Sequence, residues 1–391
     1  MKHAGRLRIL HVGKYYPPVR GGIETFLKDL LAALKKEGVD CGAVVHEPSS
    51  LSASDIKREE VNLWKAASFG EVLYTPISPG FPAALTRALA SFSPHIIHFH
   101  LPNVSAFWCL AMPLARNVPW VIQWQSDVVP SSIDNRLRLA YRFYRPFEQA
   151  LIGRSRAVIA SSKPYLDASL PLRRWIKKCH VVPLGLNPDR LPRPGQDVIS
   201  DGERSWKGKE SLRVLAVGRL TYYKGFDVLL KAVKGLKRVA VQIVGDGALR
   251  KDLTEKIRAL NLEDRVSLRG EVCDEELQGL FATAHCLCLP SIERTEAFGI
   301  VLLEAMHYGL RVAASDIPGS GVGWVVKSSG SGFLFQPGDP SSLAETLELI
   351  SRLPAGKNIN QENVDTCIPP QFNIASVAKQ VLGIYEGILD G

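Results

Sequence analysis

The sequence predicts an α/β protein made of two doubly wound domains, each with a parallel β-sheet between layers of helices. Short continuous apolar runs, which are typical of buried parallel strands, alternate with longer segments of helical periodicity. This alternation occurs twice, on either side of residues 187–211, which are rich in proline, glycine and polar residues and predict a linker or boundary loop. The length of 391 residues and the 46% hydrophobic content suffice for two cores.

The first half contains the elements of one such domain. Strands are predicted at residues 8–13, 39–46, 95–100, 118–124 and 157–161, and helices at residues 22–36, 83–92 and 134–156. Pro146 is expected to interrupt or kink the last of these helices. Residues 48–70 are polar and irregular, and they predict a loop or a short helix.

The second half repeats the pattern. Strands are predicted at residues 212–217, 239–244, 266–268 and 286–288, and helices from residue 226, at 274–284, at 298–306, from residue 340 and at 372–389. Cys286 and Cys288 share one face of their strand, where they would fill the core. Seven cysteines without a C-x-x-C pair argue against a disulfide framework and against a zinc ribbon.

Composition limits where the protein acts. No stretch of eighteen or more apolar residues occurs, and the N-terminal apolar run is too short for a signal peptide. We therefore expect a cytoplasmic protein, either free or attached peripherally to the inner face of the plasma membrane.

The positive charge is concentrated in the first half. Residues 1–190 hold 25 Lys and Arg against 14 Asp and Glu, whereas the remainder holds 23 against 25. No nucleic-acid-binding motif accompanies this charge, so an anionic membrane surface is the favoured partner and nucleic acid is not expected. Residues 134–156 combine six arginines with four aromatic residues, which is typical of a helix on an anionic bilayer. The alternative is an ordinary helix whose aromatic residues face the core.

Residues 290–309 predict a ligand site at the start of a helix. Glu296 lies at the expected start, Glu304 follows eight residues later, and Gly309 lies where a left-handed cap would end the helix. A helix start attracts anions, and a carboxylate can accept hydrogen bonds from two vicinal hydroxyl groups. This pattern indicates a nucleotide diphospho-sugar, with the hexose near Glu296 and the ribose near Glu304.

A second element supports this interpretation. The apolar run 212–217 ends in Gly-Arg-Leu-Thr-Tyr-Tyr-Lys-Gly, so a buried strand leads into a loop with two cations. Arg219 and Lys224 could converge on a diphosphate, the first as a planar fork and the second as a point charge. Together, the G-R-x4-K-G loop and the E-x7-E segment resemble the retaining glycosyltransferase family 4, whose members have the GT-B fold of two Rossmann-like domains facing a cleft.

The resemblance implies a division of labour between the domains. Residues 1–190, together with a returning helix at 372–391, would form the acceptor-binding domain, and residues 191–371 would bind the nucleotide sugar. The donor would contact Arg219, Lys224, Glu296 and Glu304, the helix-start residues Phe298, Gly299 and Ile300, and Val272 near the base. The catalytic set would comprise Glu296, His100, Arg219 and Lys224.

The resemblance also assigns residues in the first domain. Gly21 and Gly22, which open a predicted helix, correspond to a loop that contacts donor or acceptor, and His100 corresponds to a histidine that contacts the donor hexose. Asn103, Gln125 and Asp127 are candidates for acceptor binding. Gln125 departs from the His-Ser-Asp pattern of many relatives, and because glutamine does not titrate, an acid–base role at this position is in doubt.

No metal or other cofactor is expected. His98 and His100 form an H-x-H pair, but no neighbouring carboxylate or cysteine in the sequence completes a set of ligands. The absence of D-x-D, P-loop and G-x-G-x-x-G motifs argues against metal-dependent GT-A transferases, ATP hydrolysis and Rossmann dehydrogenases.

The expected function is transfer of a hexose from a nucleotide diphospho-sugar to a hydroxyl of a lipid-linked glycan or polysaccharide, with retention of configuration. Residues 319–324 and 125–127 are similar to segments of bacterial polysaccharide mannosyl- and deoxymannosyl-transferases, which favours a GDP-mannose-type donor over a UDP-sugar. Two alternatives remain open: a GT-B sugar epimerase, and a catalytically silent membrane partner of another transferase. Gln125 favours the silent partner, whereas the intact acidic and basic set argues against it.

Overall fold

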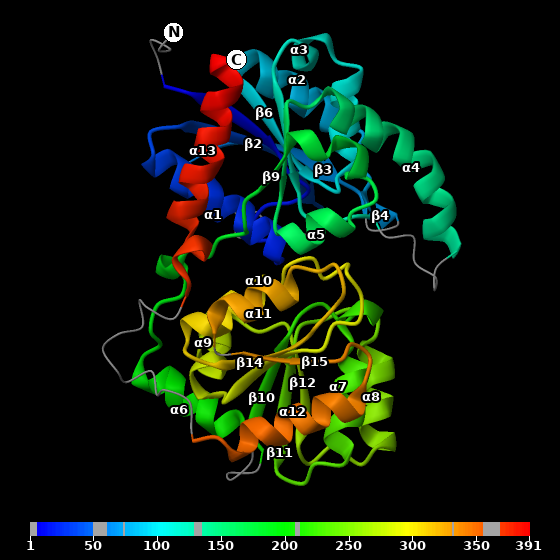
Figure 1. Cartoon of the computed structure of the whole chain (residues 1–391), viewed down its shortest axis with the longest axis vertical. Coiled ribbons are helices and arrows are strands. Elements are labelled where there is room, and N and C mark those ends of the chain that lie inside the picture. The colour runs from blue at the N-terminus through cyan, green and yellow to red at the C-terminus, as the bar shows by residue number, and fades with distance from the viewer. Residues whose placement is uncertain are drawn as a thin grey trace. The chain divides into compact units, whose positions relative to one another are not determined.

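The computed structural model describes residues 6–49, 61–72, 75–128, 135–207, 212–330, 332–354 and 368–391. The chain forms two compact units (Figure 1). Unit 1 comprises Met1–Leu186 and Gln371–Gly391, and unit 2 comprises Asn187–Pro370. Each unit contains a parallel sheet with helices packed on it, so the predicted fold of two Rossmann-like domains is confirmed.

Unit 1 is built on a seven-stranded parallel sheet in the order β3-β2-β1-β6-β7-β8-β9. The strands are β1 (Arg8–Val12), β2 (Asp40–Pro48), β3 (Asn62–Ser68), β6 (Ile96–Leu101), β7 (Trp120–Trp124), β8 (Ala157–Ala160) and β9 (Cys179–Val181), and β4 (Glu71–Val72) pairs separately with β5 (Thr75–Pro76). The helices are α1 (Gly22–Lys36), α2 (Phe81–Phe92), α3 (Pro113–Arg116), α4 (Asn135–Arg154), α5 (Lys163–Ala168) and α13 (Ile374–Asp390), with the 3-10 helices η2 (Val104–Leu110), η3 (Arg173–Lys178) and η7 (Pro370–Phe372).

The chain end belongs to unit 1, as expected for a returning helix. α13 packs against α1 (Figure 1). The Tyr385 hydroxyl lies 2.6 Å from His98 Nδ1 on the central strand β6. Tyr385 is fully buried, so this contact fixes the helix to the sheet through the interior of the unit.

Unit 2 is built on a six-stranded parallel sheet in the order β12-β11-β10-β13-β14-β15. The strands are β10 (Leu212–Val217), β11 (Val239–Val244), β12 (Val266–Gly270), β13 (Cys286–Leu289), β14 (Arg311–Ser315) and β15 (Gly332–Phe335). The helices are α6 (Gln196–Ser205), α7 (Phe226–Lys234), α8 (Arg250–Ala259), α9 (Asp274–Thr283), α10 (Ile300–His307), α11 (Val322–Ser329) and α12 (Pro340–Arg352), with η4 (Pro188–Arg190) and η5 (Tyr222–Lys224). Cys286 and Cys288 are buried in its core, as predicted.

Two elements contradict the sequence prediction. β3 lies within the segment 48–70 that was expected as a loop or short helix, because an edge strand is only partly buried and needs no continuous apolar run. α6 lies within the expected linker 187–211. It approaches α9 closely at Gly202, where a Cβ atom would lie 2.5 Å from the carbonyl oxygen of Gly279. Because α6 and α9 meet at glycines, this contact adds no apolar side chains at helical spacing to the sequence.

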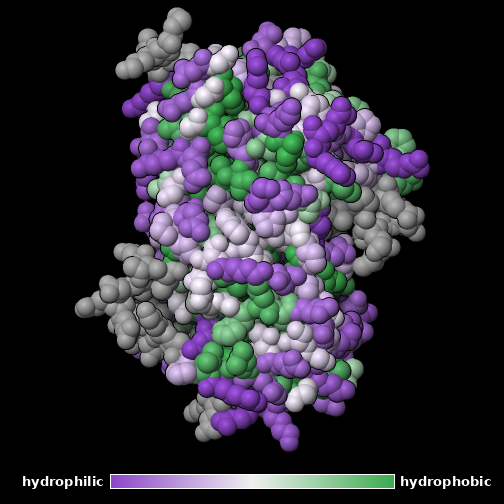
Figure 2. Space-filling model, viewed as in Figure 1, coloured by the Kyte–Doolittle hydropathy of each residue, from purple (hydrophilic) through white to green (hydrophobic). Residues whose placement is uncertain are grey.

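α4 (Asn135–Arg154) continues through Pro146, so the expected interruption is wrong. Pro146 is exposed, and water can hydrate the carbonyl group that loses its helical partner. The helix buries Leu151 and Ile152 as an ordinary amphipathic helix would, but it also buries Glu148 fully and leaves Phe143 and Phe147 72% and 53% exposed. The alternative in which the aromatic residues face the core is therefore wrong for both phenylalanines. Figure 2 shows apolar and strongly hydrophilic side chains next to each other over this helix.

None of the helices in the described residues is long and apolar enough to cross a membrane.

Candidate active site

The loop after β10 is brought against the loop after β13 in unit 2. Gly225, between η5 and α7, has a φ angle of +67°, and a Cβ atom there would lie 1.9 Å from the carbonyl oxygen of Pro290. Tyr223 O also accepts a hydrogen bond of 2.8 Å from Ile292 N. Glycine is therefore required at position 225, both for the left-handed backbone and for this close approach.

This approach joins Lys224 and Glu296 in an ion pair. Lys224 Nζ lies 2.5 Å from Glu296 Oε2, and Ser291 Oγ donates to the same oxygen at 3.0 Å. The two charged side chains are only 13% and 11% exposed. Burial alone would lower the pKa of Lys224, but the Glu296 carboxylate raises it above its usual value, so the lysine stays cationic.

Arg219 adds a second cation at the end of β10. Its side chain is exposed, and its guanidinium makes no hydrogen bond or ion pair with another described residue. It is close enough to Lys224 to affect that group electrostatically. A paired, largely buried lysine beside an exposed arginine is a suitable arrangement for an anionic ligand with several oxygens.

The prediction that Glu296 lies at the start of the helix that carries Glu304 is wrong. α10 begins at Ile300 after Gly299, which has a φ angle of +74°, so Glu296 lies in the preceding loop. Phe298 also precedes the helix and is buried, with its ring centroid 6.3 Å from that of Trp324. Gly309, with a φ angle of +71°, follows the helix as expected.

Glu304 makes a separate contact from Glu296. Its Oε1 accepts a hydrogen bond of 2.8 Å from Arg190 Nη2, an arginine that the sequence interpretation did not select. Val272, the expected neighbour of the base, is buried after β12. Unit 2 therefore brings Lys224 and Glu296 together, with Arg219 nearby, and places Glu304 in a second pair.

In unit 1, His100 belongs to a buried cluster of three histidines. Its Nε2 lies 3.0 Å from His11 Nδ1, and its Nδ1 lies 3.2 Å from the Gln125 amide nitrogen. Burial lowers the pKa of His100 to about 3 and holds those of His11 and His98 well below their usual value. His100 is thus neutral near pH 7, and because both of its ring nitrogens already have protein partners, one of these hydrogen bonds would have to break before His100 could bind a ligand.

The sequence interpretation missed His11. A signal was present, because β1 and β6 are neighbouring parallel strands in register, with His11 beside His98. One nitrogen from each of His11, His98 and His100 lies within 4.8 Å of the others, which makes this the one group of described residues with the composition of a metal site. His11 Nε2 and His98 Nε2 have no partner among the described residues, whereas both nitrogens of His100 are hydrogen-bonded, so metal binding would require one of the His100 hydrogen bonds to break.

The three acceptor candidates are buried and partly committed to local structure. Asn103 accepts from Ser105 N at the start of η2, and Asp127 Oδ1 accepts from Trp124 Nε1 at 2.8 Å and from Ser169 Oγ at 2.7 Å. Asn103 Nδ2 and Gln125 Oε1 have no partner among the described residues. These two atoms retain capacity for a ligand, whereas Asp127 mainly holds the loop after β7 in place.

Gly21 and Gly22 open α1 as predicted. A Cβ atom on Gly21 would lie 2.1 Å from Glu24 Oε2, so the carboxylate of Glu24 folds back over the glycine. That carboxylate is the end of a flexible side chain, and the φ angle of Gly21 is 170°, so α1 itself does not require glycine at position 21.

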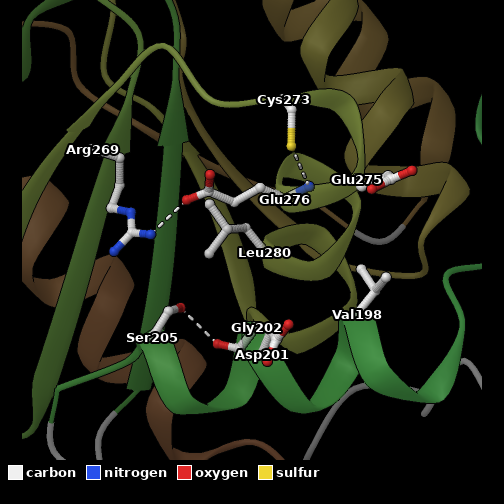
Figure 3. Close-up of a pocket in the computed structure, with 9 residues that line it drawn as sticks. All are labelled: Val198, Asp201, Gly202, Ser205, Arg269, Cys273, Glu275, Glu276 and Leu280. Carbon is white, nitrogen blue, oxygen red and sulfur yellow. Dashed lines mark hydrogen bonds and ion pairs between the residues drawn. The ribbon is translucent and has the colours of Figure 1, made fainter.

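A groove between α6 and α9 lies apart from these residues. Figure 3 shows its lining, in which Arg269 contacts Glu276 and Ser205 Oγ donates to Gly202 O. Asp201 and Glu275 add further negative charge to the groove. None of the predicted site residues lines it, and its acidic character is unsuited to a diphosphate.

Two family models match the chain, one in each unit. Residues 21–185 match the family described as glycosyl transferase 4-like domain, and residues 201–363 match the family described as glycosyl transferases group 1. These two matches cover most of both units. The chain belongs to glycosyltransferase family 4.

Individual relatives cover most of the chain. It is 26% identical over 388 residues to O-antigen chain mannosyltransferase C of Escherichia coli, covering 98% of this chain and 99% of the relative. It is 28% identical over 352 residues to D-rhamnosyltransferase WbpZ of Pseudomonas aeruginosa, covering 87% and 86%.

Solved structures establish the GT-B fold. Sucrose-phosphate synthase from Thermosynechococcus elongatus has a TM-score of 0.80 at 22% identity, covering 98% of this chain and 100% of that one. WaaG, a glycosyltransferase involved in lipopolysaccharide biosynthesis, has a TM-score of 0.70 at 18% identity, covering 97% and 100%.

Proposed function

We propose that this glycosyltransferase moves a hexose from a nucleotide diphospho-sugar to a hydroxyl of a lipid-linked glycan or polysaccharide, with retention of configuration. The observation that carries the proposal is the convergence of Arg219, Lys224 and Glu296 at the ends of β10 and β13. Arg219 and Lys224 bind the diphosphate and neutralise the charge that develops on it as it leaves, without a metal ion. Glu296, oriented by Lys224, accepts hydrogen bonds from the hexose.

The transfer step is a substitution at the anomeric carbon. The bond from this carbon to the diphosphate oxygen breaks, the acceptor oxygen forms the new bond, and the acceptor proton passes to the leaving diphosphate. Positioning and charge stabilisation supply most of the rate enhancement. Attack on the same face that the diphosphate leaves gives retention without an enzyme nucleophile.

A GDP-linked mannose or deoxyhexose is the preferred donor. The supporting observation is that one of the two relatives named above is a mannosyltransferase and the other is a D-rhamnosyltransferase. Solved neighbours include a UDP-glucose complex at 19% identity, so a UDP-sugar is the second candidate. The proposed acceptor class is supported by the O-antigen in the name of the first relative.

The test is nucleotide release from GDP-mannose and UDP-glucose in the presence of EDTA and a membrane extract that supplies acceptor. Arg219→Ala, Lys224→Ala and Glu296→Ala should each lower turnover by about a hundredfold. Lys237→Ala, which removes an exposed lysine of the same unit, should leave turnover unchanged. Near-normal turnover in all three site variants would contradict the proposal, and nucleotide binding without turnover of either donor would favour the silent-partner alternative.

We further propose that unit 1 rests on an anionic membrane surface through α4. The exposed face of this helix carries Leu139, Phe143 and Phe147, which recur every four residues and are 58%, 72% and 53% exposed. Arg142 and Arg145 are exposed beside this stripe. Apolar side chains next to arginines are suited to insertion among anionic headgroups, where a lipid-linked acceptor would also be found.

Co-sedimentation with vesicles tests the membrane proposal. The protein should bind vesicles containing about a third phosphatidylglycerol more tightly than pure phosphatidylcholine, and salt should weaken binding. Phe143→Ser with Phe147→Ser should abolish binding, whereas Phe69→Ser, which changes a phenylalanine of 65% exposure outside α4, should not. Equal binding by these variants would contradict a role for α4.

A further inference from the structure

The segment that begins unit 2 is attached to the helix that carries the predicted ribose ligand. Leu186 is the last residue of the first segment of unit 1, Arg190 is the last residue of η4 (Pro188–Arg190), and residues 191 and 192 follow it. Arg190 Nη2 donates to Glu304 Oε1 at 2.8 Å, and this is the central contact of the attachment.

Two further hydrogen bonds join the same partners. His307 Nε2 lies 2.8 Å from Leu191 O, and the Tyr308 hydroxyl donates to Pro192 O at 3.2 Å. His307, the last residue of α10, and Tyr308, its C-cap, lie three and four residues after Glu304, so all three side chains can reach the same side of the helix end. Three consecutive residues of the segment are thus bound at one end of α10, and the guanidinium of Arg190 is held at a fixed position beside Glu304.

The pair leaves part of Glu304 free for a ligand. Arg190 and Glu304 are 31% and 15% exposed, and Glu304 Oε2 makes no hydrogen bond with another described residue. A carboxylate held through one oxygen has lost much of its rotational freedom, while its second oxygen can accept hydrogen bonds from vicinal hydroxyl groups. An unpaired glutamate would have to be immobilised when the nucleotide binds.

We propose that Arg190 is a positioning residue that orients Glu304 for the ribose hydroxyls of the donor nucleotide. This inference rests on the proposed function, because it takes Glu304 as the ribose ligand. Arg190 acts through Glu304 and does not itself contact the ribose. The effect of removing it should therefore disappear when the nucleotide lacks the hydroxyl groups.

The test is isothermal titration calorimetry, which measures the dissociation constants of GDP, UDP and their 2′,3′-dideoxy forms for the full chain. Arg190→Gln should weaken binding of the preferred nucleoside diphosphate about tenfold and leave binding of its dideoxy form almost unchanged. Arg190→Lys, which keeps a cation near Glu304, should recover part of the loss. Arg193→Gln, which changes an exposed arginine of the same segment, should behave as wild type.

The variants also separate this inference from the proposed function. Adding Glu304→Gln to Arg190→Gln should cause no further loss, since both changes remove the same oriented carboxylate. Equal weakening of the ribose and dideoxy nucleotides by Arg190→Gln, or full additivity with Glu304→Gln, would overturn the positioning role while leaving nucleotide binding intact. Failure of the folded wild-type protein to bind any of the four nucleotides would overturn both.

Discussion

Glu148 is a buried carboxyl group whose ionisation should lower the stability of unit 1 near neutral pH. Its side chain is fully buried on the inner face of α4, where one oxygen is 3.3 Å from the Tyr141 hydroxyl and the other has no partner among the described residues. Burial and, to a smaller extent, the Asp127 carboxylate raise the pKa of Glu148 to about 7 against the opposing effect of the Tyr141 hydroxyl. The folded protein therefore keeps a proton that the unfolded chain releases near pH 4.5.

The sign of the resulting pH dependence follows from proton binding. Between pH 4.5 and 7 the folded state binds more protons at this site than the unfolded state. The contribution of Glu148 to the free energy of unfolding therefore decreases as the pH rises and levels off above pH 7. The interval between the two pKa values corresponds to a total of about 3 kcal/mol. Between pH 5 and pH 8 the loss should be about 2 to 3 kcal/mol.

Glu148→Gln removes the titration and keeps the shape of the side chain. The change in the free energy of urea unfolding from pH 5 to pH 8 should be less favourable in the wild type than in this variant by about 2 to 3 kcal/mol, since the buried histidines contribute equally to both proteins. Glu386→Gln, which changes an exposed glutamate on α13, should retain the wild-type pH dependence. Parallel pH dependences of the wild type and Glu148→Gln would refute the assignment of a buried, protonated carboxyl group.

Three other predictions concern the site. Gly225→Ala should destabilise unit 2 by about 2 kcal/mol or more in urea unfolding, because φ is +67° and a backbone oxygen would lie 1.9 Å from the new Cβ. Gly235→Ala, which has open space around it, should not destabilise the unit. Equal effects of the two changes would contradict the packing at Gly225. Lys224→Met should cost about 2 to 3 kcal/mol of stability, because it leaves the Glu296 carboxylate without its cation. Adding Glu296→Gln should recover part of the lost stability. Strictly additive losses would contradict a buried ion pair. The pH profile of kcat/KM should contain no step near pH 6.5 from His100, and a step that disappears in His100→Gln would show that this imidazole titrates.

Much of the fold follows from local patterns in the sequence. β10 (Leu212–Val217) and β11 (Val239–Val244) coincide with continuous apolar runs, and α1 (Gly22–Lys36) begins and ends where its glycines and lysines predict. Such runs are recognisable because a strand buried on both faces excludes polar residues. β3 lacks this signal because it lies at the sheet edge, and α6 lacks it because it packs through a glycine.

The contacts of the candidate site were less predictable. The sequence indicated Lys224 and Glu296 separately, but their ion pair depends on how the loops after β10 and β13 meet, 72 residues apart. Arg190 reaches Glu304 from 114 residues away, and no local pattern in the sequence reports that contact. His11 could have been predicted, because neighbouring parallel strands place it beside His98.

The central claim is that unit 2 binds a nucleoside diphosphate through Arg219 and Lys224. The most direct measurement is the thermal unfolding of the wild type and of Arg219→Ala with GDP, UDP, ADP and dTDP. One nucleotide, expected to be GDP, should stabilise the wild type by about 2.7 kcal/mol at a hundred times its dissociation constant, and Arg219→Ala should lose most of that stabilisation. No stabilisation of the folded wild type by any nucleotide, or equal stabilisation of the wild type and Arg219→Ala, would contradict the claim.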